Sequence, residues 1–160
     1  MRFHHVCLCV SDLEKSLKMW TGLFDFTVQI RFCSPGDAGP TGFDESKLDE
    51  MEEMLGRRDA VIDCALLTSP DGAMLEIQEA HNPVVRKTPE EYNSYFVTGM
   101  RELAFRVDDI DGWFERVKEA GFRPTTDAVW DFGENARSFL FYDDDDIRIQ
   151  LWEDSNAGWI

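Results

Sequence analysis

The stretch HHVCLCVSDLEKSL, at residues 4–17, has a counterpart later in the chain, RELAFRVDDIDGWF, at residues 101–114. Both begin with apolar and polar residues in alternation, which is the pattern of a half-buried strand, and both continue with apolar residues at helical spacing. A second pair of segments matches in the same order: SPDGAMLEIQEA at residues 69–80 and DDDDIRIQLWED at residues 143–154. The chain therefore contains an internal repeat, and this repeat specifies its architecture.

Each half of the repeat predicts a β-α-β-β-β order of elements. In the first half, Ser11 and Glu14 have the spacing of a helix N-cap and its capping box, and the acidic segment 44–54 predicts an added short helix. The strands of the first half are expected at residues 3–10, 26–33, 60–69 and 73–80. Those of the second half are expected at residues 101–107, 122–132, 136–144 and 146–154.

This order predicts an α+β fold in a single domain, residues 1–160, made of two tandem βαβββ modules. The first module is expected at residues 1–80 and the second at residues 100–154. Residues 81–99 between them contain two prolines and no clear period, so we interpret this segment as a linker.

The composition narrows the range of functions. The 160 residues carry a formal net charge of −16, which disfavours nucleic acids and anionic membranes as partners because both attract basic surfaces. No apolar run approaches the ~20 residues that cross a bilayer, and the opening run is too short for a signal peptide. The four cysteines have no regular spacing, which indicates reduced thiols. We therefore expect a cytoplasmic protein.

Four polar residues occupy matching places in the two halves. His5 and Glu102 lie near the start of equivalent first strands, while Glu76 and Gln150 lie in the middle of equivalent last strands. Apolar residues fill the alternate positions of these strands. Because successive side chains of a strand point to opposite faces, all four polar side chains are expected on the face away from the helices.

These segments resemble the vicinal oxygen chelate superfamily, which includes glyoxalase I, methylmalonyl-CoA epimerase, the extradiol dioxygenases and the bleomycin-resistance proteins. The resemblance covers residues 3–153 and is carried by HHVCLCVSDLEKSL, SPDGAMLEI, LAFRVDDIDGWFERVKEAGF and FYDDDDIRIQLWE. It implies that the two modules form a cup-shaped mixed sheet around a metal, with ligands from the first and last strand of each module. It also implies a homodimer, since single-chain members often exchange modules between subunits.

Position by position, the resemblance implies His5, Glu76, Glu102 and Gln150 as the metal ligands. His5 and Glu76 match the family pattern, whereas Glu102 replaces a histidine and Gln150 replaces a glutamate. One imidazole, two carboxylates and an amide oxygen suit an open octahedral site for Mn²⁺, Fe²⁺, Ni²⁺, Co²⁺ or Mg²⁺. Zn²⁺ in an open site is a further candidate. The alternative is a chain that has lost the metal and kept the cup for binding.

The resemblance implies a glyoxalase-type isomerase or lyase, in which the metal polarises a small carbonyl compound and stabilises an enediolate. A carboxylate then removes the proton next to the carbonyl as the general base. Gln150 cannot take up a proton. The catalytic base is therefore expected at Glu102, with Glu76 as the second candidate.

Two other functions compete with this hypothesis. Dioxygenase chemistry normally uses two histidines on one metal face, but the alternation of the first strand turns His4 away from His5. Dioxygenase activity is therefore the less favoured hypothesis. The stronger competitor is a metal-free binding protein of the bleomycin-resistance type, whose acidity would attract a cationic drug.

Five further residues share the face of the expected ligands: Met74, Gln78, Arg106, Arg148 and Trp152. The two arginines are candidates to clamp a substrate carboxylate or phosphate, or else they form salt bridges to the carboxylates of the site itself or lie exposed at strand ends. The tryptophan offers a flat apolar wall to an aromatic or acyl ligand, or else it packs at a dimer contact. We take all five as candidate substrate-binding residues.

Overall fold

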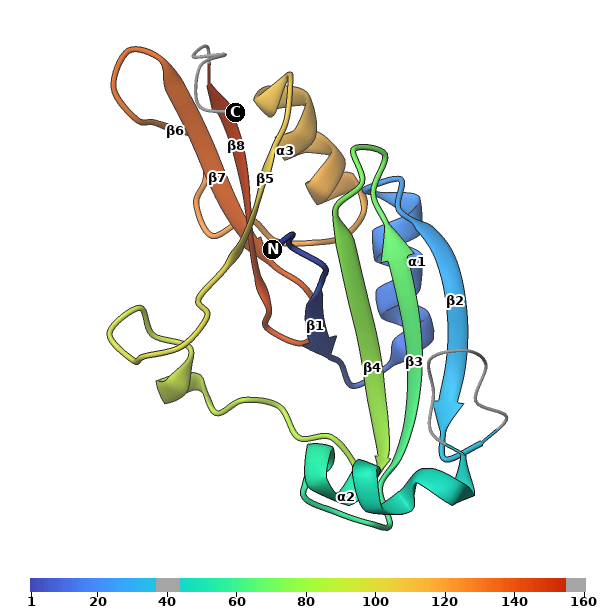
Figure 1. The fold of residues 1–160 in the computed structure, drawn as a ribbon. Coiled ribbons are helices and arrows are strands. Elements are labelled where there is room, and N and C mark those ends of the chain that lie inside the picture. Colours follow the sequence, from blue (N-terminus) through green and yellow to red (C-terminus); the bar gives the residue numbers. More distant parts are fainter. Residues whose placement is uncertain (37–43, 155–160) are drawn as a thin grey trace. The chain divides into compact units, whose positions relative to one another are not determined.

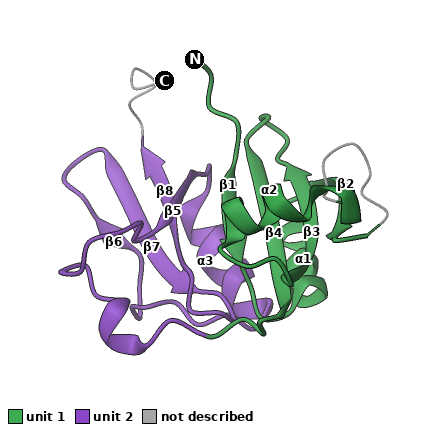
Figure 2. Cartoon of the chain, turned by 60° about the horizontal axis from the view of Figure 1, so that its bottom comes forward, with its two compact units in different colours: residues 1–86 green, residues 87–160 purple. Residues whose placement is uncertain are grey.

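The computed structural model describes residues 1–36 and 44–154. The chain divides into two units, which Figure 2 colours separately: unit 1, Met1–Arg86, and unit 2, Lys87–Ile160. Each unit contains one four-stranded mixed sheet. The predicted α+β fold with two βαβββ modules is therefore confirmed.

Unit 1 follows the predicted element order, with a short helical insertion before its last two strands (Figure 1). Its strands are β1 (Val6–Cys9), β2 (Thr27–Ser34), β3 (Val61–Thr68) and β4 (Met74–Asn82). Its helices are α1 (Leu13–Gly22), the 3-10 turn η1 (Glu45–Lys47) and α2 (Leu48–Leu55). The strand order is β1-β4-β3-β2, in which β1 runs parallel to β4 and the other pairs are antiparallel.

Unit 2 repeats this plan. Its strands are β5 (Leu103–Arg106), β6 (Trp130–Asp131), β7 (Ala136–Tyr142) and β8 (Arg148–Asp154). Its helices are the 3-10 turn η2 (Glu90–Tyr92) and α3 (Ile110–Glu119). The order β5-β8-β7-β6 matches that of unit 1, with β5 parallel to β8.

The strand expected at residues 122–132 is mostly absent. Only the two residues of β6 pair as a strand, and Pro124 forms an isolated bridge to Phe141. Proline has no N–H to donate to a ladder, so it interrupts the pairing near the start of this segment. The outer edge of the unit 2 sheet is therefore shorter than that of unit 1.

The repeat extends to the register of the parallel strand pairs. Val6 pairs with Leu75 in unit 1, and the equivalent residues Leu103 and Ile149 pair in unit 2. A shift of one residue would turn every side chain to the opposite face. The shared register therefore places matched residues of the two units at equivalent points of their sheets.

Each sheet buries one face under its helix. α1 packs against β4, and Trp20 of this helix is fully buried, with its ring centroid 5.1 Å from Phe24 and 5.2 Å from Phe26. In unit 2, α3 packs against β7 and β8, and Phe114 meets the edge of Phe139 at 5.1 Å. These aromatic contacts form the centre of each core. Among the described residues, no helix is long and apolar enough to cross a membrane.

Burial alternates along the last strand of each unit. Leu75 and Ile77 on β4 are buried, as are Ile149 and Leu151 on β8. The half-buried residues that lie between them are Glu76 and Gln150. Strand alternation therefore places Glu76 and Gln150 on the faces that the helices leave uncovered, as the sequence predicts.

The N-cap of α1 differs from the prediction. Asp12, not Ser11, caps the helix, because its Oδ1 accepts a hydrogen bond from the N–H of Lys15 at 2.9 Å. A second carboxylate serves the same helix end: Glu79 of β4 accepts a hydrogen bond from the N–H of Leu13 at 2.8 Å. The first N–H groups of a helix have no intrahelical partner, so both contacts stabilise this terminus.

Unit 2 uses the same device at the start of α3. Asp109 accepts a hydrogen bond from the N–H of Gly112, and Glu153 of β8 accepts one from the N–H of Ile110 at 3.1 Å. Glu79 and Glu153 occupy equivalent places in the repeat. In both units, a glutamate on the last strand therefore ties the helix to the sheet.

Replacing Glu79 by alanine should lower the free energy of unfolding by about 1–2 kcal/mol, because a half-buried N–H at the positive helix end loses a charged acceptor. The same change at Glu153 should have a similar effect. Urea unfolding measures the change in the free energy of unfolding for each variant. Glu53→Ala, at an exposed position of α2, is the control and should change stability by less than about 0.5 kcal/mol. Equal losses at Glu53 and Glu79 would contradict this role.

The acidic turn between β7 and β8 is not simply a solvated surface. Asp143 is buried, and its Oδ1 accepts hydrogen bonds from the N–H groups of Asp145 at 2.9 Å and Ile147 at 2.8 Å. Burial raises the pKa of Asp143 to about 6, although the two N–H donors act in the opposite direction. The folded protein therefore binds a proton on this carboxylate at a pH where the unfolded chain does not.

This shift predicts that Asp143 makes the protein less stable as the pH rises from about 4 to about 6. In this window the folded state binds more protons than the unfolded state, so the free energy of unfolding falls, by on the order of 3 kcal/mol at most. Asp143→Asn keeps an oxygen acceptor and removes the titration. Its stability relative to wild type should therefore rise with pH in urea unfolding at pH 4, 5, 6 and 7. Asp127→Asn, at an exposed position, is the control, and its stability relative to wild type should not change with pH. If the stability difference between Asp143→Asn and wild type is the same at every pH, the raised pKa of Asp143 is refuted.

Candidate functional site

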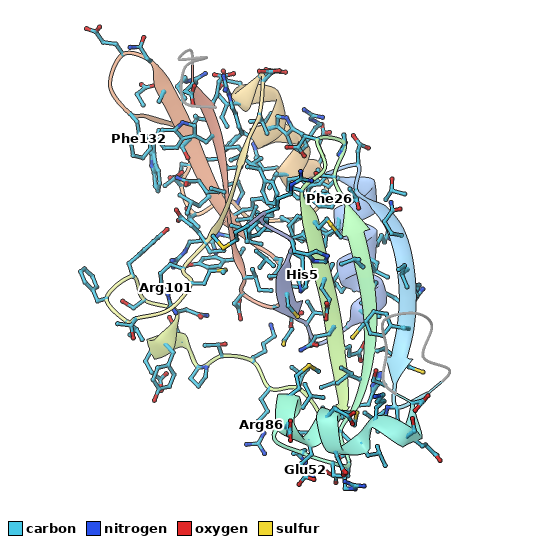
Figure 3. The ribbon with its side chains drawn as sticks, viewed as in Figure 1. His5, Phe26, Glu52, Arg86, Arg101 and Phe132 are labelled. Atoms are coloured by element: carbon cyan, nitrogen blue, oxygen red, sulfur yellow. The ribbon has the colours of Figure 1, made fainter. Side chains whose placement is uncertain are left out.

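His5 and Glu76 lie together in unit 1. His5 comes directly before β1, Glu76 lies on the adjacent β4, and His5 Nε2 is 3.4 Å from Glu76 Oε2. Their side chains are 33% and 23% exposed, so both are accessible without being free in solvent. Figure 3 labels His5 beside the sheet. The structure therefore brings together the two residues that match the family pattern.

Two thiols share this face with Glu76. Cys7 and Cys9 are exposed on β1; Cys7 Sγ is 3.8 Å from Glu76 Oε1, and Cys9 Sγ accepts a hydrogen bond from Gln78 Nε2 at 2.9 Å. A hydrogen bond between the thiols lowers the pKa of Cys9 to about 6 and raises that of Cys7. Gln78, predicted to bind substrate, therefore contacts a thiol in this structure.

Glu102 lies in unit 2, directly before β5, and is half-buried. Its Oε2 accepts a hydrogen bond from the hydroxyl of Tyr95. Burial raises the pKa of Tyr95, and the Glu102 carboxylate raises it further, so the phenol keeps its proton and acts as the donor. Gln150 lies on β8, half-buried, opposite Ala104 of β5.

Arg148 is held by neutral groups. Its Nη2 donates to the hydroxyl of Tyr142 at 2.6 Å and to the carbonyl of Asn93 at 3.0 Å, and its guanidinium lies 4.1 Å from the ring centroid of Tyr95. Its Nη1 is buried and has no hydrogen-bond partner within residues 1–36 and 44–154. These contacts orient the guanidinium without pairing it to a carboxylate.

Two of the other predicted substrate-binding residues contact Asp154, and the third lies at the start of β4. Arg106 lies 3.5 Å from a carboxylate oxygen of Asp154 and donates to the carbonyl of the same residue, so it forms a salt bridge with a residue outside the expected site. Trp152 donates to Asp154 at 3.1 Å, and its ring packs on Phe132 with centroids 5.0 Å apart. Met74 begins β4 and is half-buried.

His5 and Glu76 are close enough to bind one hard divalent cation, but two ligands do not make a complete metal site. Two ligands at right angles on one ion with ~2.1 Å bonds would lie about 3 Å apart, close to the separation of His5 and Glu76. Over the described ranges, no three His, Cys, Asp or Glu side chains gather in the way that would hold a metal. His5 and Glu76 belong to unit 1, whereas Glu102 and Gln150 belong to unit 2.

Tyr95 is the residue that the sequence reasoning missed. It lies in residues 81–99, which were interpreted as a linker because they show no strand or helix period. The available signal was its composition: EEYNSYF, residues 90–96, combines aromatic and polar residues six to twelve positions before Glu102. Neither propensity nor periodicity predicts the contact, because it depends on how this segment folds back onto β5 and β8.

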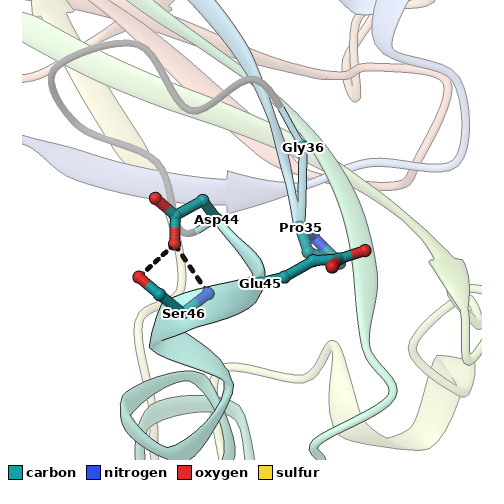
Figure 4. Close-up of a pocket in the computed structure, with 5 residues that line it drawn as sticks. All are labelled: Pro35, Gly36, Asp44, Glu45 and Ser46. Atoms are coloured by element: carbon teal, nitrogen blue, oxygen red, sulfur yellow. Dashed lines mark hydrogen bonds between the residues drawn. The ribbon is translucent and has the colours of Figure 1, made fainter.

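A separate pocket of unit 1 does not contain the predicted site residues. Figure 4 shows its lining at the end of β2 and the start of η1: Pro35, Gly36, Asp44, Glu45 and Ser46. The Asp44 carboxylate accepts hydrogen bonds from the N–H and hydroxyl of Ser46. The pocket and the His5–Glu76 pair are therefore distinct features.

Comparison of the whole structure with solved structures supports the fold. A glyoxalase family protein from Bacillus cereus superposes with a TM-score of 0.78 at 17% identity, covering 96% of this chain and 94% of that one. A glyoxylase/bleomycin resistance protein/dioxygenase domain from Frankia sp. EAN1pec gives 0.66 at 20% identity, covering 98% and 94%. The fosfomycin resistance protein FosX from Listeria monocytogenes, complexed with Mn(II) and sulfate ion, gives 0.62 at 18% identity, covering 97% and 93%.

Comparison of the sequence with known protein families shows the family to which the chain belongs. No curated protein matches this chain. The family model described as Glyoxalase/Bleomycin resistance protein/Dioxygenase superfamily matches residues 2–151, which is nearly the whole chain and includes both halves of the repeat. The chain belongs to the glyoxalase/bleomycin resistance protein/dioxygenase superfamily.

Proposed function

We propose that the chain is a divalent-metal-dependent isomerase or lyase of the glyoxalase type, acting on a small carbonyl compound. The observation that carries the proposal is the His5–Glu76 pair, in which Nε2 and Oε2 lie 3.4 Å apart on the uncovered side of adjacent strands. His5, Glu76, Glu102 and Gln150 would hold the metal. When bound, the metal would act as a Lewis acid that polarises the substrate carbonyl.

Glu102 is the proposed general base. It is a carboxylate where the family pattern implies a histidine, and the Tyr95 hydroxyl holds one of its oxygens. Its role is to remove the proton from the carbon next to the carbonyl and to return it at the neighbouring position. Glu76, beside His5, is the second catalytic candidate. Gln150 has a neutral amide and serves only as an oxygen donor.

Arg148 is the better of the two arginine candidates for a substrate anion. Arg106 already pairs with Asp154 at 3.5 Å, whereas the hydrogen-bond acceptors of Arg148 within the described residues are uncharged oxygens, and its buried Nη1 has no described partner. A guanidinium suits a carboxylate or phosphate because it presents parallel N–H donors. We propose that Arg148 orients the anionic group of the substrate, with Met74, Gln78 and Trp152 as candidate lining residues.

A metal-free binding protein is the second candidate. The observation that favours it is the formal net charge of −16, which would attract a cationic ligand. Such a binder requires no affinity for divalent cations at His5 and Glu76. Metal binding therefore separates the two functions.

Thermal unfolding with Mn²⁺, Ni²⁺, Zn²⁺ or EDTA tests the proposal. Mn²⁺ is the first choice because FosX from Listeria monocytogenes was crystallised with Mn(II). A metal at 100 times its Kd stabilises the fold by about 2.7 kcal/mol, so the Tm should rise and EDTA should reverse the rise. The variant His5→Ala/Glu76→Gln should show no rise. Unchanged Tm values for the wild-type protein with all three metals would favour the binder.

A further inference from the structure

The hydroxyl of Tyr95 donates to Glu102, the residue placed above as base and metal ligand. Tyr95 belongs to neither a strand nor a helix; it lies between η2 and β5. A hydrogen bond to one carboxylate oxygen restricts the rotation of that carboxylate and leaves its other oxygen for a different partner.

The ring of Tyr95 is fixed by Arg148 of β8. The guanidinium lies 4.1 Å from the ring centroid, and the same group donates to the carbonyl of Asn93 at 3.0 Å. Two contacts two residues apart therefore attach this segment to the last strand of unit 2. One links to the side chain of Tyr95 and the other to the backbone beside it.

Arg101 organises the rest of the segment. Its guanidinium donates to the carbonyls of Tyr92 and Ser94, and also to those of Thr98 and Gly99. Figure 3 labels Arg101 at this loop. One side chain therefore satisfies four backbone acceptors on both sides of Tyr95, so the loop has a defined conformation.

We propose that Tyr95 is a positioning residue that holds the Glu102 carboxylate in its working orientation. This inference rests on the proposed function, since it assigns Glu102 to a metal. Hydrogen-bond partners of metal ligands typically contribute 10–100-fold to metal affinity. Tyr95 would contribute in this way without touching the metal.

The test measures Mn²⁺ affinity in four proteins: wild type, Tyr95→Phe, Glu102→Ala and the double variant. Tyr95→Phe keeps the ring over Arg148 and removes only the hydroxyl, and its Kd for Mn²⁺ should rise about 10–100-fold. The double variant should bind no more weakly than Glu102→Ala, because alanine leaves no side-chain oxygen through which the hydroxyl can act. Co²⁺ absorption spectra of the same proteins report the geometry of the ligands directly.

Tyr92→Phe is the matched control, since Tyr92 and Tyr95 are both 55% exposed and the carbonyl that binds Arg101 remains. Its Kd for Mn²⁺ should not change. Wild-type affinity in Tyr95→Phe, or losses that add in the double variant, would overturn the inference and leave the proposed function standing. A wild-type protein that binds none of Mn²⁺, Co²⁺, Ni²⁺ and Zn²⁺ would overturn the proposed function and this inference together.

Discussion

Replacing Glu102 by glutamine is expected to lower turnover of a small carbonyl substrate by about 10²–10⁴-fold, the usual contribution of a general base. An amide cannot take up the proton that leaves the carbon next to the carbonyl. The fold should be little affected, because Glu102 is half-buried and an amide oxygen can still accept a hydrogen bond from Tyr95. The free energy of unfolding should stay within about 0.5 kcal/mol of wild type.

The assay follows deuterium exchange at that carbon by proton NMR in D₂O. The Mn²⁺-loaded protein is tested on a panel of small 2-hydroxy aldehydes and 2-hydroxy ketones, each with and without a carboxylate or phosphate. Glu134→Gln, at an exposed position of unit 2, is the control and should exchange at the wild-type rate. A wild-type rate in Glu102→Gln would exclude Glu102 as the base and would leave Glu76 as the candidate.

The largest effect on stability is expected from Phe139→Ala, which should lower the free energy of unfolding by about 3–5 kcal/mol. Phe139 lies on β7, is fully buried, and meets the edge of Phe114 from α3 at 5.1 Å. Truncation removes the aromatic contact and leaves a cavity between helix and sheet. A loss of this size is a large part of the 5–15 kcal/mol that stabilises a typical domain.

Phe96→Ala is the matched control for this change. It is the same substitution in the same unit, but Phe96 is 99% exposed, so no cavity forms. Urea unfolding should give a difference from wild type of less than about 0.5 kcal/mol. Comparable losses at Phe96 and Phe139 would show that the core of unit 2 is not centred on the contact between α3 and β7.

The architecture could be predicted from the sequence because the repeat is visible in it. Strand alternation and helical spacing in residues 4–17 and 101–114 predicted elements that are present, and the shared register of Val6–Leu75 and Leu103–Ile149 agrees with the repeat. Local spacing is sufficient for this because burial follows the period of each element.

Details that depend on tertiary contacts were not predicted. Ser11 has the spacing of an N-cap, but the chain enters the helix so that Asp12 reaches the N–H of Lys15. In the sequence, Glu79 has the pattern of an ordinary strand glutamate, and only the fold brings β4 beside the start of α1. Likewise, the acidic run at residues 143–146 gave no indication that Asp143 is buried.

The candidate site was predicted only as a set of positions. Alternation identified the uncovered face, and the family resemblance implied that Glu76 lies with His5, which the structure shows at 3.4 Å. It could not identify Tyr95, because a contact from an irregular segment has no period in the sequence. Nor could it separate Arg148 from Arg106, since the partners of both side chains depend on residues distant in the chain.

Calorimetric titration of Mn²⁺ into the metal-free protein tests the central claim most directly. We expect the wild-type protein to bind one ion per chain, and His5→Ala/Glu76→Gln to lose that binding while it remains folded. Binding of equal affinity in the wild type and the variant would contradict the assignment of His5 and Glu76. A wild-type protein that binds none of Mn²⁺, Ni²⁺ and Zn²⁺ in such titrations would contradict the proposal that this chain is a divalent-metal-dependent enzyme.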